Sequence, residues 1–121
     1  MATAAKWLPA PKAGDLPGAE SFLSLLLPVA VARRLARRLG RVAQQPFRAK
    51  DVLRASGLPL LPRSDPDVAR NRRLVERGKP LSPILLVRDR QLGRVVIADG
   101  YHRLCAAHSF DRNAMVACRV V

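Results

Sequence analysis

Hydrophobic and polar residues follow two different periods along this chain of 121 residues. In the first half, apolar residues recur every three to four positions, which is typical of amphipathic helices. In the second half, short apolar runs lie between Pro, Gly and Asp residues, which is typical of strands. The pattern predicts an α+β domain, in which a helical first half is followed by two strands, a helix and a last strand.

The longest helical period covers Val29–Val42. The residues on its apolar face are Val31, Leu35, Leu39 and Val42, and those on its other side are Arg33, Arg34, Arg37, Arg38 and Arg41. Two interpretations of the arginine side are open. It is either a contact surface for nucleic-acid phosphates, or a solvated helix face whose basic residues suit the negative end of the helix dipole.

Capping signals place further helices in the first two thirds of the chain. We expect helices over 20–27 and 49–55, the second of which is followed by a glycine. Asp65 is a strong N-cap and Pro66 suits the first helical position, so another helix should run from there to about Arg77.

The second half is expected to contain strands over 84–87, 94–98 and 115–121, and a helix over 102–109. A charged turn joins the first two strands, which predicts a hairpin. Residues 1–19 are rich in Ala, Pro and Gly and are expected to form an extended arm. Residues 20–121 then form one domain, with a helical lead-in over 20–64 and a core over 65–121.

The charge of the chain is strongly unbalanced. Its formal net charge is +13, from 22 Lys and Arg residues against 9 Asp and Glu residues. This favours a polyanionic partner such as a nucleic acid or a nucleotide. A compositional explanation is also open, because Arg greatly outnumbers Lys and Ala is abundant, as in GC-rich coding sequences.

Hydropathy and cysteine content bear on localisation. No apolar run approaches the roughly 20 residues that cross a bilayer, and the best candidate, 22–32, is interrupted by Ser24 and Pro28. The first residues lack the order of a signal peptide. Cys105 and Cys118 are too few for a disulfide framework. We therefore expect a cytoplasmic protein with reduced thiols and no membrane partner.

The candidate chemistry lies in Asp99-Gly100-Tyr101-His102-Arg103, which joins an apolar strand to a helix. A turn through Gly at the start of a helix points several unpaired backbone N–H groups at one place. The positive end of the helix dipole and the forked guanidinium of Arg103 both favour an anion there. The sequence therefore predicts a phosphate or carboxylate site.

The sequence from Val68 to Val121 resembles the ParB/sulfiredoxin superfamily, whose small stand-alone members are of the ParB-like nuclease type. The matching features are a helix that ends in Glu-Arg-Gly-Lys-Pro, a Pro-Ile-x-x-Val strand, a hairpin return, an Asp-Gly-x-His-Arg turn, and a helix with paired alanines. The resemblance implies a bacterial-type protein with a small mixed sheet flanked by helices. It also implies a nucleotide or phosphate at the start of the motif helix, with Gly100, His102 and Arg103 in the corresponding positions.

Departures from the family motifs reduce the number of superfamily activities that we expect of this chain. Sulfiredoxins place their catalytic Cys immediately before the His-Arg pair, where this chain has Tyr101, so sulfinic-acid reduction is not expected. ParB proteins that bind CTP have a Gly-Glu-Arg-Arg-x-Arg box, whose Glu and last Arg fall on Tyr101 and Cys105. Free-serine kinases of the superfamily carry a motif closer to Asp99–Tyr101, together with a catalytic Glu for which this chain offers only Glu20 and Glu76.

The motif residues have alternative roles. Asp99 is either the N-cap of the helix, or a general base or a ligand of metal-bound water. His102 is either an acid/base or phosphate-donor candidate, because imidazole titrates near neutrality, or a surface or hydrogen-bonded histidine near the helix start. Tyr101 either stacks on a base or sugar or covers the loop. The spacing of His102, Cys105 and His108 would suit zinc, but no fourth ligand is apparent, and we predict no metal site from them.

Two classes of function follow. The leading hypothesis is a phosphate- or nucleotide-binding domain in which Gly100–Arg103 hold the anion, while Asp99 and His102 supply any acid/base step of phosphoryl transfer or nuclease-type hydrolysis. A nucleotide and Mg²⁺ are the cofactors it would use. The alternative is a catalytically inactive adaptor that binds DNA or a protein. The apolar residues Leu25–Leu27 leave a homodimer open.

Overall fold

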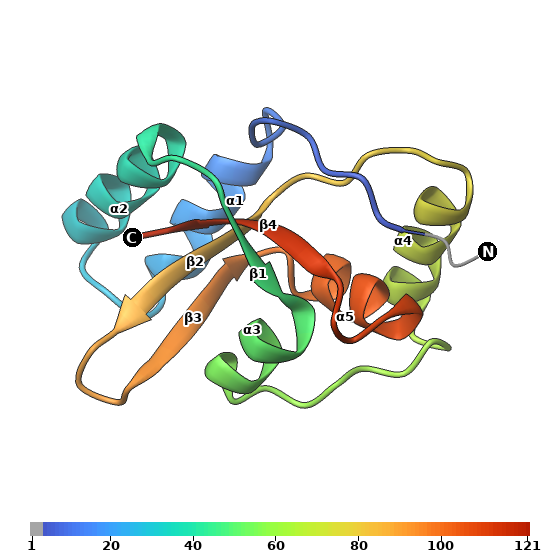
Figure 1. Cartoon of the computed structure of the whole chain (residues 1–121). Helices are drawn as coiled ribbons and strands as arrows, with labels where there is room; N and C mark the ends of the chain where they lie inside the picture. Colours follow the sequence, from blue (N-terminus) through green and yellow to red (C-terminus); the bar gives the residue numbers. More distant parts are fainter. Residues whose placement is uncertain (1–3) are drawn as a thin grey trace.

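The computed structural model describes residues 4–121, which form five helices and four strands (Figure 1). The elements are α1 (Asp15–Leu23), α2 (Val29–Arg41), β1 (Gln45–Arg48), α3 (Ala49–Ser56), α4 (Pro66–Glu76), β2 (Ile84–Asp89), β3 (Arg94–Asp99), α5 (Tyr101–Phe110) and β4 (Met115–Val120). The strands form one mixed sheet with helices on both sides, and α1 and α2 come first, which confirms the α+β class and the helical first half.

The sheet has the strand order β1-β4-β2-β3. β2 and β3 form the predicted antiparallel hairpin, and β1 is antiparallel to β4. The chain crosses from β3 through α5 to β4, which lies parallel to β2 with Cys118 opposite Ile84. Because β2 has neighbours on both edges and helices on both faces, its first four residues are all buried instead of alternating.

Alternate residues of β2 face two helical layers. Ile84 and Leu86 pack with α3 and α5, whereas Leu85 and Val87 pack with α1 and α2. α4 packs on the outer side of α5, where Val68 is fully buried. This layering brings the beginning of α5 close to the beginnings of both β2 and α4. Among residues 4–121, no helix combines the length and the apolar character needed to cross a bilayer.

The predicted start of α4 is confirmed. Asp65 Oδ1 accepts hydrogen bonds from the backbone N–H groups of Asp67 (2.9 Å) and Val68 (3.1 Å), and Pro66 occupies the first helical position. The helix ends at Glu76, one residue before the expected end. The other elements predicted after residue 28 also lie within two residues of their observed bounds.

The first helix differs from its prediction at both ends. α1 begins at Asp15, inside the arm expected over 1–19. The helix accommodates Pro17 because Pro17 lies in the first turn, where a backbone N–H has no helical partner to lose. α1 ends at Leu23, and the connection 24–27 to α2 is a turn that leaves part of its apolar surface exposed.

The remaining arm is tied to the domain by a short β-bridge. Trp7 pairs in parallel with Leu81, just before β2. The backbone N–H of Leu8 donates to the Leu81 carbonyl, and the N–H of Leu81 donates to the Lys6 carbonyl, each at 2.8 Å. The arm therefore fixes the chain that leads into the central strand.

The sequence pattern does not predict β1. The strand contains Pro46 and shows no alternation of buried and exposed residues. It forms because Gln45–Arg48 pair with β4, more than 60 residues further along the chain. Pro46 is tolerated because β1 is an edge strand, where one side of the backbone has no partner.

Arg119 on β4 is buried, with 9% of its surface exposed, and no carboxylate contacts it within residues 4–121. Its guanidinium donates to Gln44 Oε1 (3.0 Å) and to the backbone carbonyls of Leu39 (3.2 Å), Gly40 (3.0 Å) and Pro9 (3.2 Å). Two of these carbonyls belong to the last turn of α2, so the cation meets the negative end of that helix. Arg119 thereby joins β4, α2 and the arm.

Candidate phosphate-binding site

The Asp99–Arg103 turn lies where β3 ends and α5 begins. Gly100 is the N-cap residue of α5, with φ +107° and ψ 15°, and no side chain caps the helix. A Cβ at Gly100 would lie 3.0 Å from Arg103 Nη2 and 3.2 Å from the Cα of Ile84. Both the backbone angles and the space therefore require glycine. The predicted turn geometry is present, with the first-turn N–H groups left without a side-chain cap.

Arg103 is held across the start of β2. Its Nε donates to the Ser82 carbonyl at 3.0 Å, and its Nη2 donates to the Pro83 carbonyl at 3.1 Å and to Asp99 Oδ2 at 2.8 Å. Its side chain is 17% exposed. Nη1 has no acceptor within residues 4–121, so one edge of a rigidly placed guanidinium is left over. The sequence did not predict these hydrogen bonds, which connect Arg103 on α5 to the residues just before β2.

Asp99 does not cap α5. Gly100 takes the N-cap position, and the Asp99 carboxylate pairs with Arg103 one helical turn away. The capping alternative for Asp99 is therefore wrong, because its side chain turns toward the guanidinium. As a partner of Arg103, Asp99 orients the cation and offsets its charge.

Tyr101 and His102 lie at the outer side of the turn. The Tyr101 hydroxyl donates to the Pro59 carbonyl, so the ring covers the loop before α4. Burial raises the pKa of Tyr101, and the neighbouring Cys105 and Asp65 raise it further. The His102 side chain is 41% exposed, against 27% for Asp99, and is therefore the more accessible of the two predicted acid/base groups.

A second group of polar side chains lies beside His102. Ligand atoms of Asp65, Asp67 and His102 all lie within 4.8 Å of one another, with His102 Nε2 3.9 Å from Asp67 Oδ2. Carboxylate oxygens and an imidazole are donors that divalent cations accept. One oxygen of Asp65 already caps α4, and Asp67 Oδ1 contacts Arg70 at 2.9 Å. In the sequence, these two aspartates indicated only a helix start.

His102, Cys105 and His108, whose spacing along the sequence would suit zinc, are not brought together as a ligand group within residues 4–121. In this described part of the chain, the three possible metal ligands that lie together beside α5 are Asp65, Asp67 and His102. Cys105 is instead fully buried in the core. Burial raises the pKa of the Cys105 thiol, and burial raises that of Cys118 to about 12. Because the thiolate is the nucleophilic form, a raised pKa makes each thiol a poorer nucleophile near neutral pH.

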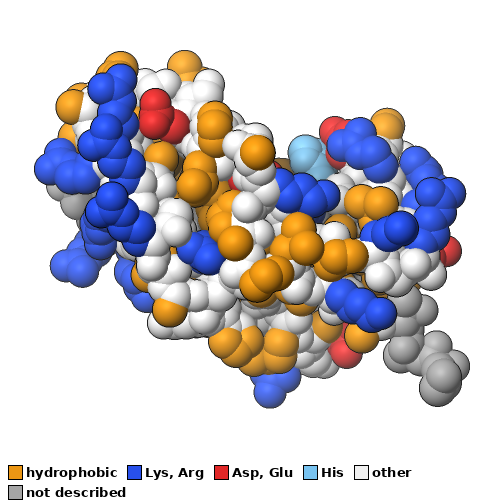
Figure 2. Space-filling model, turned by 90° about the horizontal axis from the view of Figure 1, so that it is seen from above, with side chains coloured by type: hydrophobic (Ala, Val, Ile, Leu, Met, Phe, Trp, Pro, Cys, Tyr) orange, Lys and Arg blue, Asp and Glu red, His pale blue; other side chains and the backbone are white. Residues whose placement is uncertain are grey.

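The arginine side of α2 is distant from this turn in the fold. All five of its arginines are exposed, and none contacts a carboxylate within the described residues. Basic side chains gather along the edge of the molecule where α2 lies (Figure 2). The buried residues of the helix are Ala32, Ala36 and Leu39. The five arginines of α2 therefore form an exposed, positively charged surface, as both sequence-based interpretations of this helix require.

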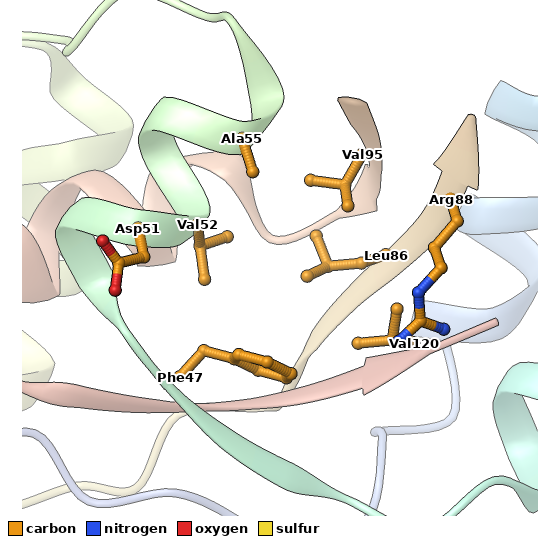
Figure 3. A pocket seen from close by; sticks show the side chains of 8 residues that line it. All are labelled: Phe47, Asp51, Val52, Ala55, Leu86, Arg88, Val95 and Val120. Atoms are coloured by element: carbon orange, nitrogen blue, oxygen red, sulfur yellow. The ribbon is translucent and has the colours of Figure 1, made fainter. Parts of the chain in front are cut away.

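A small apolar cavity of about 210 Å³ opens between α3 and the sheet (Figure 3). Its walls are made by Phe47, Val52, Ala55, Leu86, Val95 and Val120, and Asp51 and Arg88 lie at its edges. None of the Asp99–Arg103 residues lines it. The cavity offers no group that could act on a phosphate beside the turn.

The structure shows the mixed sheet and the helix that follows Gly100, which establish the α+β class. No family model, curated protein or solved structure matches the chain.

Proposed function

We propose that this protein is a ParB/sulfiredoxin-like domain that binds a phosphate group, carried by a nucleotide or a nucleic acid, at the first turn of α5. One observation carries the proposal: the uncapped start of the helix lies directly beside the guanidinium of Arg103, which three hydrogen bonds hold in place. Backbone N–H groups and a fixed cation together are a common way to bind phosphate.

The fixed position of Arg103 favours binding because little side-chain entropy remains to be lost. The Asp99 carboxylate and the aspartates at the start of α4 offset part of the positive charge. A Mg²⁺ ion that arrives with the nucleotide would compensate for the negative charge of these carboxylates, since Asp65, Asp67 and His102 are donors that such an ion accepts. The proposal therefore favours a metal–nucleotide complex over a free anion.

The turn also limits the chemistry. Asp99 is paired with Arg103, so His102 is the motif residue that a bound phosphate could reach for proton transfer. Phosphoryl transfer or phosphodiester hydrolysis would then use His102 as acid or base and Asp99 as a positioning residue. This assignment differs from the sequence-based hypothesis, in which both residues shared the acid/base step.

The test combines calorimetry with amide NMR. ATP, CTP and pyrophosphate, each with and without Mg²⁺, are titrated into the wild-type protein, His102→Gln and the matched control His108→Gln on the same helix. We expect a loss of about tenfold in affinity for His102→Gln and no loss for His108→Gln. The largest amide shifts should lie at residues 101–103. Shifts confined to α2, or no binding by the wild type, would refute the phosphate site.

A second candidate function is nucleic-acid binding through α2 without catalysis. The observation that favours it is the set of five exposed arginines that have no carboxylate partner within the described residues. If all five contact phosphates, the logarithm of the affinity for duplex DNA should fall with the logarithm of the salt concentration with a slope of about −4.5. Replacing Arg33, Arg37 and Arg41 by Gln should reduce that slope by about half, whereas His102→Gln should leave it unchanged.

A further inference from the structure

A groove lies on the opposite side of the sheet from α5. It has a volume of about 730 Å³ and runs between the α1–α2 connection and the end of the β2–β3 hairpin. Its floor is made by Leu26, Leu27, Leu35, Val87 and Val96, and its rim carries Arg38, Arg90 and Arg94. We call this surface the Leu/Arg groove.

The floor leaves apolar surface in water. Leu26 is 56% exposed, and next to it on the connection Leu25 is 83% exposed. Phe22 (41%) and Val29 (59%) flank the same connection, but like Leu25 they lie beside the groove and do not line it. Burying apolar surface is worth about 25 cal/mol per Å², and adjoining exposed apolar side chains of this kind mark interaction surfaces. The groove is therefore suited to an apolar occupant.

The rim determines the charge of that occupant. The acidic residue that lines the groove is Asp89, and its carboxylate is already 3.6 Å from Arg94 Nε. Arg38 and Arg90 have no carboxylate partner within residues 4–121. An occupant with carboxylates beside its apolar residues would pair with these two guanidinium groups.

Other occupants fit less well. A second copy of the chain would bring another net charge of +13 against the same arginines. A single-stranded nucleic acid binds through aromatic stacking platforms, and the residues lining the groove include no aromatic side chain. An aliphatic floor with a basic rim matches an amphipathic helix laid into a groove.

We propose that the Leu/Arg groove binds an acidic amphipathic helix of a partner protein, with Leu-type anchors on Leu26, Leu35 and Val96 and carboxylates on Arg38 and Arg90. This inference is independent of the phosphate site, because no residue is shared. The partner would occupy the face covered by α1 and α2, and the start of α5 would stay accessible.

The test uses a fluorescein-labelled peptide of about five helical turns, with Leu at positions i, i+4 and i+7 and Glu on both flanks. Binding is followed by fluorescence anisotropy. Leu26→Asn and Arg38→Ala should each weaken binding about tenfold. The matched controls are Leu60→Asn, an exposed leucine elsewhere (48%), and Arg33→Ala on another side of α2; both should bind like the wild type.

Four further measurements decide the outcome. A peptide of the same composition with scrambled order should bind at least tenfold more weakly, and a peptide with Lys in place of Glu should not bind. Equal binding of the scrambled peptide, or no saturable binding of the Leu/Glu peptide, overturns the proposal. So does sedimentation of the wild type as a dimer that Leu26→Asn dissociates. Displacement of the peptide by single-stranded DNA in a manner that depends on Leu26 also overturns it.

Discussion

Replacing Gly100 by Ala tests the corner on which the phosphate proposal depends. Gly100 has φ +107°, a value that an L-residue rarely adopts, and a Cβ there would lie 3.0 Å from Arg103 Nη2 and 3.3 Å from its Cζ. The added methyl group therefore meets three obstacles. The backbone is strained, the guanidinium has to move away from its acceptors, and the Cα of Ile84 lies only 3.2 Å from the added atom.

The size of the expected loss of stability is worked from the first two of these obstacles. A left-handed backbone costs an L-residue about 1–2 kcal/mol. Displacing Arg103 weakens three hydrogen bonds of a charged donor, and such bonds are worth about 1.5–3 kcal/mol each when fully lost. We expect Gly100→Ala to lower the free energy of unfolding by about 3–4 kcal/mol. Gly57→Ala, at φ +68° with nothing within 4 Å of its Cβ, should cost only about 1–2 kcal/mol.

Urea unfolding followed by far-UV circular dichroism measures both values. The same pair of substitutions is then repeated in Arg103→Ala, where the excess cost of Gly100→Ala should shrink because the displaced group is gone. Equal losses for the two glycines in the wild-type background would show that the guanidinium does not press against Gly100. The reasoning about a rigidly placed cation would then be wrong.

Two further predictions concern buried groups. Arg119→Met should lower the free energy of unfolding by about 3 kcal/mol, because it leaves the last carbonyls of α2 without their charged donor; urea unfolding checks this, and an unchanged midpoint would contradict it. The raised pKa of Cys118 means that the folded state keeps a proton that the unfolded chain loses above about pH 9. The stability contributed is fully present below that pH and is lost as the pH rises toward about 12, up to about 4 kcal/mol in all. Unfolding at about pH 8 and about pH 11 should therefore show a steeper loss for the wild type than for Cys118→Ala, and parallel losses would be inconsistent with a buried thiol.

Local signals in the sequence predicted most of the fold. Asp65 and Pro66 define the start of α4 through contacts within one helical turn, so their chemistry is visible without the rest of the chain. β1 is different, because Gln45–Arg48 form a strand only when β4 lies beside them. The start of α1 was obscured by Pro17, which signals a helix breaker in sequence but is harmless in a first turn.

The candidate site was predictable in its backbone but not in its side-chain contacts. The order strand, Gly100, helix follows from residues that are adjacent in sequence. The acceptors of Arg103 at Ser82 and Pro83 lie about twenty residues earlier, and their position depends on how β2 passes α5. For the same reason, the closeness of Asp65 and Asp67 to His102 appears only when α4 packs on α5.

The bridge between Trp7 and Leu81 gives this protein an internal optical reporter. Trp7 is the single tryptophan of the chain, and its indole N–H is buried without a hydrogen-bond partner within residues 4–121. Leu81 immediately precedes Ser82 and Pro83, the carbonyl acceptors of Arg103. Because the backbone of Trp7 pairs with the residue just before these acceptors, the intrinsic emission of Trp7 reports without a label on the chain segment that holds Arg103.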